Sequence, residues 1–201
     1  MSVNLKKGQR IDLRKSNGDT LRNVTVGLGW DVIAPPKKGG ILGFFAPAPP
    51  DVDCDASVIM CIDGKLKTNR DVIYFGNLKH SSGSVRHMGD NLTGAGDGDD
   101  EQIVVKLTEV PAEYDKLVFV VNIYQAQQHN QHFGMIQNCF IRIVDNDTNT
   151  ELCRFDLSEN YSGQTAMIFG EVYRKDGDWK FNAIGQGTTD GSLTQLTQRF
   201  S

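Results

Sequence analysis

A twelve-residue stretch from Asp90 to Glu101, DNLTGAGDGDDE, concentrates groups that bind cations. It holds five carboxylates and no Lys or Arg, so it contributes −5 to a chain whose formal net charge is −4. Calcium takes about six to eight oxygen ligands, and interleaved glycines let a backbone turn its carbonyls inward. The side chains that could supply oxygen here are Asp90, Asn91, Asp97, Asp99, Asp100 and Glu101. The stretch therefore predicts a calcium site.

Three further acids are expected to join it. Asp31 ends the alternating run NVTVGLGWD, and Asp53 and Asp55 open another apolar segment two residues apart, on the same face of a strand. If these strand ends meet the glycine-rich loop, the acids share one rim, where we expect two calcium ions. Two alternatives stay open. One is magnesium, which prefers octahedral geometry with retained waters, and the other is a solvated acidic loop without an ion.

Strands dominate the elements that must position these acids. Period-2 alternation and runs of β-branched and aromatic residues recur between turn signals. The runs LVFVVNIY and CFIRIV are apolar on both faces, as in strands covered on both sides. The number and spacing of the segments predict an all-β protein built as a two-sheet β-sandwich. The expected strands span 23–31, 56–62, 71–75, 102–107, 116–126, 139–144, 152–157, 166–174 and 179–185.

The rest of the chain suggests how this sandwich is completed. Leu193, Leu196 and Phe200 have helical spacing, which predicts one short C-terminal helix over a sheet edge, with Asp190 or Ser192 as its N-cap. With 201 residues, 39% of them apolar, we expect a single domain over 1–201, interrupted by a Pro/Gly-rich loop insertion at 34–50. The four cysteines form no CxxC pair and are expected to be buried free thiols: Cys54, Cys61, Cys139 and Cys153.

Composition and motifs exclude several classes of function. Outside the acidic stretch the formal charges of the residues sum to +1, so the sequence shows no excess of basic residues that would bind the backbone of a nucleic acid. Apolar runs such as Leu117–Val121 fall far short of the about 20 residues that cross a membrane, and the start lacks the apolar core of a signal peptide. We therefore expect a cytoplasmic protein. No GxSxG motif is present, so we expect no enzyme activity, with a metal-dependent hydrolase as the alternative.

Six segments carry a family resemblance: GLGWD (27–31), DCDAS (53–57), GDNLTGAGDGDDEQI (89–103), FVVNIY (119–124), MIFGEVYR (167–174) and WKFNAIGQG (179–187). They resemble the TerD family of bacterial tellurium-resistance and stress proteins, particularly its TerZ-type members, over about residues 1–200. The resemblance implies a calcium-binding β-sandwich with ligands in the DxD and GDNLTGxGDGDDE segments. It also implies a role in resistance to tellurite, phages and colicins, as a calcium-ordered binding or scaffolding module. Its partners would be other stress proteins or a membrane protein complex.

The insertion supports a second hypothesis, in which the protein docks to a membrane. The apolar 39–50 loop lies next to Lys37 and Lys38, so it could dock an anionic membrane beside bound calcium and hold the protein at the inner membrane face. The alternative is that its apolar side chains cover the protein's own core.

The segment DNDTN (145–149) is interpreted as a β-hairpin turn, because an EF-hand loop needs Gly where Thr150 stands and Glu where Asp156 stands.

Overall fold

The computed structural model describes residues 2–15, 17–33, 52–90 and 98–201. The predicted loop insertion at 34–50, with its 39–50 apolar loop, lies outside the described residues. So do Asn91 and Asp97 of the acidic stretch, and the side chain of Asp90.

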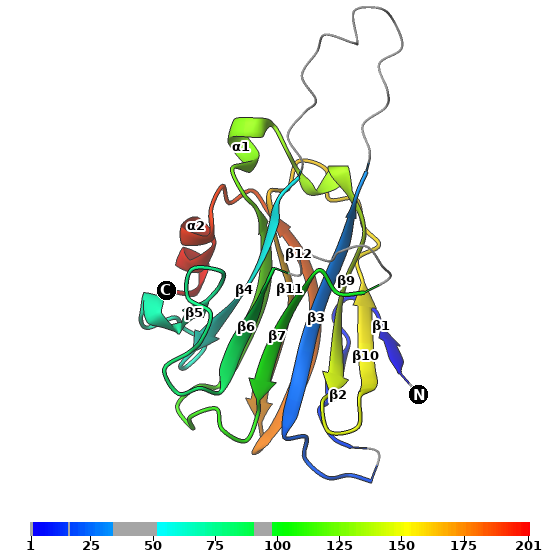
Figure 1. Cartoon of the computed structure of the whole chain (residues 1–201), viewed down its shortest axis with the longest axis vertical. Coiled ribbons are helices and arrows are strands. Elements are labelled where there is room, and N and C mark those ends of the chain that lie inside the picture. The colour runs from blue at the N-terminus through cyan, green and yellow to red at the C-terminus, as the bar shows by residue number, and fades with distance from the viewer. Residues whose placement is uncertain (1, 16, 34–51, 91–97) are drawn as a thin grey trace, which may run out of the picture.

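Two six-stranded sheets face each other across a common core, and in Figure 1 strands β3 and β7 lie in front of β11 and β12. Neighbouring strands pair antiparallel, apart from β1 and β10, which pair parallel. The predicted all-β sandwich is confirmed. Sheet A has the order β1 (Val3–Leu5), β10 (Thr150–Asp156), β9 (Ile136–Asp145), β3 (Asn23–Val32), β7 (Glu101–Lys106), β6 (Val85–Asp90). Sheet B has the order β2 (Arg10–Asp12), β12 (Asp178–Thr188), β11 (Ala166–Lys175), β8 (Lys116–Ile123), β4 (Cys54–Cys61), β5 (Val72–Ile73).

Each of the nine expected strands is present, with ends that differ by a few residues. Three strands, β1, β2 and β6, were not predicted. The first two have three residues each, too few to show a period. In β6 the buried positions are Val85 and His87, so a polar side chain stands where the alternation calls for an apolar one.

The core lies between the sheets and is built by alternation. Val24, Val26 and Leu28 of β3 point into it, as do Phe119 and Val121 of β8. The other face of β8 is buried too, since Val118 and Val120 belong to a second cluster outside sheet B. This confirms the prediction that the run LVFVVNIY is covered on both sides. All four cysteines are buried and free, as predicted.

The C-terminal helix α2 (Leu193–Thr197) is present, as predicted. Ser192 is the N-cap, and its Oγ accepts a hydrogen bond from Gln195 N at 3.2 Å. Leu196 is buried in one cluster with Val72 of the edge strand β5 and with Val120 of the central strand β8, so the helix covers the outer face of sheet B from its edge inward. The outward apolar residues of these strands are what draws it there, because they would otherwise be exposed to water.

A second short helix, α1 (Ala126–His129), stands where the sequence predicted the end of a strand. Gln125, with φ 51°, turns the chain out of β8 and starts it. Three 3-10 turns complete the elements: η2 (Asn69–Asp71), η3 (Phe133–Met135) and η4 (Gln198–Phe200). Within the described residues no helix has the length and apolarity to cross a membrane.

The segment 145–149 forms the turn of the β9–β10 hairpin, as predicted. Asp145 organises the turn, because its carboxylate accepts from Asp147 N at 3.0 Å and from Thr148 Oγ1 at 2.8 Å. Asn149 has φ 52°, a conformation that Asn tolerates better than most residues.

Candidate metal centre

The structure brings the described acids of the prediction to one region of the sandwich. Asp31 lies near the end of β3, and Asp53 and Asp55 lie at the start of β4. Figure 1 shows these two strand ends at the same upper end of the molecule. Asp99, Asp100 and Glu101 lead into β7, the neighbour of β3 in sheet A. The described acids therefore lie at the same end of the sandwich, while most of the glycine-rich loop, residues 91–97, is outside the described residues.

Asp100 is fastened to β3 by two hydrogen bonds. Its backbone N donates to Leu28 O at 2.8 Å, and its Oδ2 accepts from Trp30 N at 2.7 Å. The β3–β9 register shifts between Gly29 and Asp31, so Trp30 sits in a β-bulge. A bulge leaves its extra residue outside the ladder, which makes the Trp30 N–H available to the loop.

Within the described part of the chain, the charges that act most strongly on Asp100 are negative. Burial raises the pKa of its carboxyl above the usual value, and the negative charges of Asp31 and Asp99 raise it further. The hydrogen bond from Trp30 N lowers the pKa but does not cancel the other effects. Half-buried anions that repel one another in this way are stabilised by a cation.

Asp99 lies in a different environment, paired with Arg142 of β9. Arg142 Nε donates to its Oδ1 at 2.6 Å and Nη2 donates to its Oδ2 at 3.1 Å, and 1% of the Asp99 side chain is exposed. The carboxylate lies against Gly27 of β3, where any Cβ would overlap it. Gly27 and Arg142 are register partners. The absence of a side chain at Gly27 therefore makes room for this ion pair.

Glu101 points toward the other sheet. Its Oε2 accepts from Ala56 N of β4 at 2.7 Å and lies 3.1 Å from His87 Nε2. The side chains of Glu101 and His87 are almost fully buried. This carboxylate therefore links β7 of sheet A to β4 of sheet B at the edge of the core.

The three remaining acids are more accessible. Asp31 is exposed, and its Oδ2 accepts from Asn138 Nδ2 at 2.7 Å. Asp53 is exposed and Asp55 half-buried. The pKa of the neighbouring Cys54 thiol is raised well above its usual value, first by burial, with Cys139 and the charges of Asp53, Asp55 and Glu101 adding to the effect. These carboxylates therefore share one electrostatic environment around a buried thiol.

Among the residues that the structure describes, no three His, Cys, Asp or Glu side chains approach closely enough to hold a metal ion by themselves. Asn91, Asp97 and the side chain of Asp90 lie outside that part of the chain, so the nine-residue ligand set stays a prediction. The donors present are carboxylate oxygens, which suit a hard cation such as calcium better than zinc.

Sequence reasoning missed the partners of these acids. Arg142 had a signal, since it is the one charged residue within the apolar run CFIRIV. His87 and Asn138 carried no pattern of their own.

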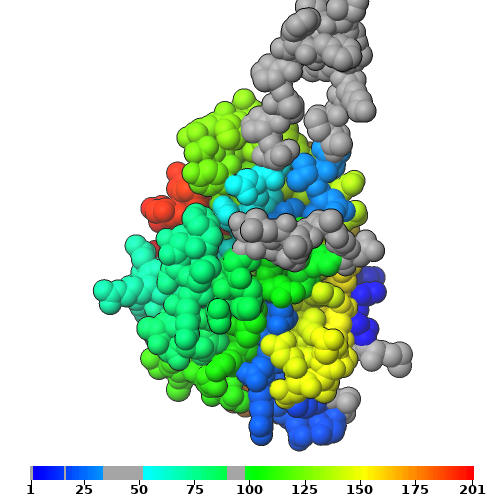
Figure 2. Space-filling model, viewed as in Figure 1, coloured from blue at the N-terminus to red at the C-terminus, as the bar shows by residue number. Residues whose placement is uncertain are grey.

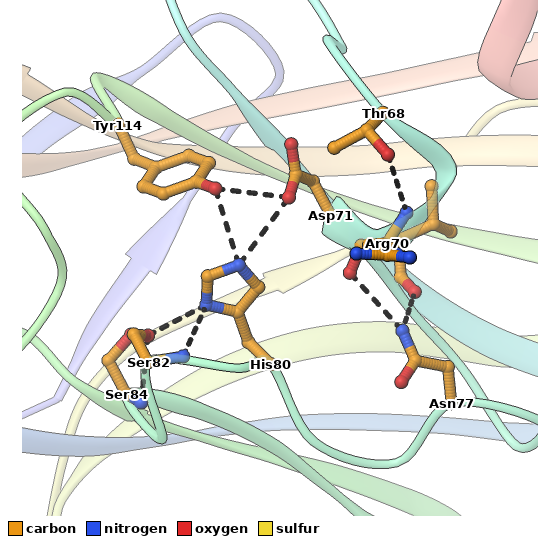
Figure 3. A network of polar contacts seen from close by, with 9 residues as sticks. Thr68, Arg70, Asp71, Asn77, His80, Ser82, Ser84 and Tyr114 are labelled. Carbon is orange, nitrogen blue, oxygen red and sulfur yellow. Dashed lines mark hydrogen bonds and ion pairs between the residues drawn. The ribbon is translucent and has the colours of Figure 1, made fainter.

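A second buried polar cluster lies away from the acids (Figure 3). Tyr114 Oη donates to Asp71 Oδ1 at 3.0 Å, His80 Nε2 lies 3.5 Å from the same oxygen, and His80 Nδ1 lies 2.7 Å from Ser82 Oγ. Asp71, His80 and Tyr114 are buried, and Ser82 Oγ also bonds Ser84 Oγ at 2.7 Å. The order Ser, His, Asp is that of a catalytic triad, but neither of the two cavities described is lined by these residues. The cluster ties η2 to the turn before β6.

These features define a class of protein, a two-sheet β-sandwich with a carboxylate-rich rim at one end. Within that class the chain belongs to the TerD domain family, whose family model matches residues 1–200. The family resemblance found in the sequence motifs is thereby confirmed.

Relatives with assigned names are similar over nearly the whole chain. "Stress response protein SCP2" of Bacillus subtilis (strain 168) is 50% identical, with 100% of both chains covered. "Tellurium resistance protein TerD" of Serratia marcescens is 46% identical (98% of this chain, 97% of the relative), and "Tellurium resistance protein TerZ" of the same organism is 40% identical (96% and 94%). The family is thus one of tellurium-resistance and general stress-response proteins.

Two solved structures have the same fold. The protein SAV2460, of unknown function, superposes with a TM-score of 0.66 at 24% identity, covering 88% of this chain and 95% of that one. A homologue of the telluride resistance protein TerD, SCO6318 from Streptomyces coelicolor A3(2), gives a TM-score of 0.63 at 20% identity, covering 90% and 98%. At this level of identity the likeness shows the fold alone.

Proposed function

We propose that the chain binds calcium, as two ions, at the acidic rim, and acts as a non-enzymatic binding or scaffolding module in a stress response. The named relatives support the stress-response part, since they are called stress-response and tellurium-resistance proteins. The calcium part is supported by the chemistry of the rim.

The environment of Asp100 carries the proposal. Its carboxylate is partly buried next to Asp31 and Asp99, and its pKa is raised by that burial and by those two charges. Arg142 compensates Asp99, but the charges of Asp31 and Asp100 still oppose each other. A divalent cation bound by Asp31 and Asp100 would remove that repulsion.

The candidate ligands divide into two groups. The first group is Asp31, Asp53, Asp55 and Asp100 at the rim, to which we add the loop residues Asp90, Asn91 and Asp97 from the sequence alone. Asp99 and Glu101 already face Arg142 and His87, so we expect them to contribute least to affinity. Calcium supplies positive charge and oxygen coordination there, and an ion that binds only the folded state raises stability by about 2.7 kcal/mol at a hundredfold excess over its Kd.

Calorimetric titration of the chelated chain with calcium and with magnesium tests the proposal. We expect submillimolar calcium binding near two ions per chain, weaker magnesium binding, and loss of at least one calcium site in Asp53→Asn/Asp55→Asn. The matched control is Asp63→Asn/Asp176→Asn, which removes two charges from exposed turn positions with positive φ, where Asn is well tolerated. No calcium binding below millimolar concentration would refute the proposal.

The scaffolding role makes a separate prediction. If calcium orders the rim for a partner, a purified tellurium-resistance or stress-response protein captured on the immobilised chain should be released by a chelator and recaptured with calcium. If the partner stays bound when the chelator is added, calcium binding itself is not contradicted, but calcium has no role in assembly with that partner.

A further inference from the structure

A cavity of about 540 Å³ lies on the outer face of sheet B, between α1, the start of α2 and β5. In Figure 1 and Figure 2 these three elements stand on the same side of the sandwich. The volume falls within the range of small-molecule sites in proteins, about 300 to 1,000 Å³. It is the larger of the two cavities described, and the function proposed above does not use it.

The floor of the cavity is polar where the same strands are apolar elsewhere. Under α2 the outward residues are Ile59 of β4 and Val118 and Val120 of β8, buried with Leu196. Farther along the same faces, Ser57 on β4 and Asn122 on β8 line the cavity instead. The outward residues change from apolar to polar at the point where the helix stops covering the sheet. The floor of the cavity therefore suits a polar ligand.

Two oxygen atoms of this floor are buried without a partner among the described residues. Ser57 is 0% exposed and Asn122 6% exposed, yet Ser57 Oγ and Asn122 Oδ1 accept or donate no hydrogen bond there. Leaving a buried polar group unpaired costs roughly 1–3 kcal/mol. Asp55, the register partner of Asn122, adds a carboxylate to the same floor. The floor therefore offers acceptors to a ligand that brings hydrogen-bond donors.

The walls carry aromatic rings that face solvent. Phe75 is 54% exposed and Tyr124 48% exposed, although both line the cavity. Tyr74 packs edge-on against Phe75 with ring centroids 5.2 Å apart, and Gln125 Nε2 donates to the Tyr124 hydroxyl at 3.2 Å. Rings fixed in this way present a flat surface to a ligand before it binds.

The opposite wall is closed by contact between α1 and the turn before α2. A Cβ at Gly191 would lie 2.7 Å from Gln127 Nε2, so glycine allows the two segments to touch. Asp190 anchors the turn, since its backbone O accepts from Thr165 Oγ1 at 2.7 Å and its Oδ2 accepts from Thr188 Oγ1 at 2.7 Å. These contacts are made within the protein, so the fold itself fixes this wall, and the cavity exists without a ligand.

The charge of the lining narrows the ligand class. Of the described residues that line the cavity, none is Lys, Arg or His, and the single charged one is Asp55. An anionic ligand would find no counter-charge. The amides and hydroxyls of the walls, such as Gln128, Ser192 and Thr194, both donate and accept, whereas an ammonium group only donates. Hydroxyl groups, which do both, match this lining best.

We propose that the cavity binds a neutral saccharide. Sugar hydroxyls donate to Asn122 Oδ1 and Asp55 and share a hydrogen bond with Ser57 Oγ, while the C–H face of the ring lies on the exposed aromatic rings. The site shares Asp55 with the calcium proposal, but neither Ser57 nor Asn122 is a candidate metal ligand, so variants of these two residues test the saccharide site separately.

Saturation-transfer NMR and calorimetry on the full chain in calcium-containing buffer test this, with glucose, galactose, mannose, N-acetylglucosamine and maltose as probes. We expect at least one to bind, and Asn122→Leu or Ser57→Ala to weaken it about tenfold or more. The same variants should keep or raise the melting temperature, because each removes an unpaired buried oxygen. The matched control, Asn182→Leu, removes an unpaired amide oxygen from β12 outside the cavity and should leave affinity unchanged.

Three results would overturn the proposal. They are no binding by any of these sugars, binding that both floor variants leave intact, and binding of tetramethylammonium or inorganic phosphate in their place. Opposite movement of stability and affinity in Asn122→Leu separates a lost contact from a damaged fold.

Discussion

The carboxylate of Asp99 lies between the guanidinium of Arg142 and the bare backbone of Gly27. Gly27 and Arg142 face each other across β3 and β9, so the salt bridge forms on the surface of sheet A. Since Arg142 Nη1 also reaches Glu151 Oε2 at 3.3 Å, one arginine holds two acids from different parts of the chain. This pair fixes where the described part of the acidic stretch meets the sandwich.

Replacing Arg142 tests how much that pair contributes. Arg142→Met removes both guanidinium donors from the nearly fully buried Asp99 carboxylate, which keeps the hydrogen bond from Gln102 Nε2 at 2.9 Å but loses its counter-charge, so the free energy of unfolding should fall by about 2–4 kcal/mol. Urea unfolding measures the loss. Lys7→Met, which removes an exposed partner of Glu159, should cost less than about 1 kcal/mol. In the double variant Arg142→Met/Asp99→Asn part of the loss should return, and strict additivity would contradict the pairing.

Glu101 is predicted to matter more for folding than for calcium. Glu101→Gln removes the charge from an acceptor shared by Ala56 N and His87 Nε2, so stability should fall by about 1–2 kcal/mol. Calcium affinity, measured by calorimetry, should change little. A large loss of affinity with unchanged stability would show that Glu101 leaves His87 to bind the ion.

Asp100→Asn should have the opposite effects. The amide oxygen can still accept from Trp30 N, while a charge whose pKa is raised in the folded state is lost. A carboxyl pKa that is raised in the folded chain means that folding favours the protonated form. The free energy of unfolding of the calcium-free chain therefore falls as pH rises from the pKa of the unfolded chain, about 3.9, through the pKa of the folded chain. At neutral pH the calcium-free variant should melt higher than the wild type. Its stabilisation by calcium should shrink, and equal calcium-induced shifts would count against Asp100 as a ligand.

The buried cluster in Figure 3 gives a fourth prediction. Tyr114→Phe removes the hydroxyl that donates to Asp71 and lies 3.3 Å from His80 Nε2, which should cost about 1–3 kcal/mol in urea unfolding. Tyr124→Phe, at an exposed ring, is the control and should stay within about 0.5 kcal/mol of wild type. Equal effects of the two changes would mean that the cluster adds no stability.

The four buried thiols predict the behaviour at alkaline pH. Burial raises the pKa of Cys61, Cys139 and Cys153 to about 12 and that of Cys54 well above its usual value. Because the thiol pKa is higher in the folded chain than in the unfolded chain, burial of the thiol contributes its full stability below the unfolded pKa, near 9. That contribution is lost as pH rises toward 12. Unfolding free energy should fall by about 1.4 kcal/mol per pH unit for each thiol. Cys153→Ala should lose stability at pH 8 but show a shallower decline between pH 8 and 10 than the wild type does.

The strands that hold the core were predictable because their alternation is direct evidence of which face is buried. The failures have physical causes. The edge strands β1 and β2 are stabilised by their neighbours and not by a pattern of their own. The extent of sheet B that α2 covers, from β5 inward to β11, was not predictable, because the sequence shows the outward residues of these strands as apolar without showing what covers them.

The acids of the rim were visible in the sequence as a run of carboxylates, but their partners were not. The ends of β3 and β4 that carry Asp31, Asp53 and Asp55 lie at the same end of the molecule (Figure 1). The contact between Asp99 and Arg142 of β9 spans 43 residues and depends on Gly27 of β3, the register partner of Arg142, a relationship that no local spacing in the sequence reveals. The polar floor of the cavity on sheet B was missed for the same reason, since Ser57 and Asn122 come from different strands.

The edge strands also set the order of events during synthesis. β1 pairs with β10 and β2 pairs with β12, so the segments of the chain made first close their sheets only against strands made among the last. Until β12 has left the ribosome, the strands waiting for these partners present open hydrogen-bonding edges, which invite pairing with other nascent chains. The time between translation of β2 and of β12 is therefore the interval in which these edges stay open to such pairing.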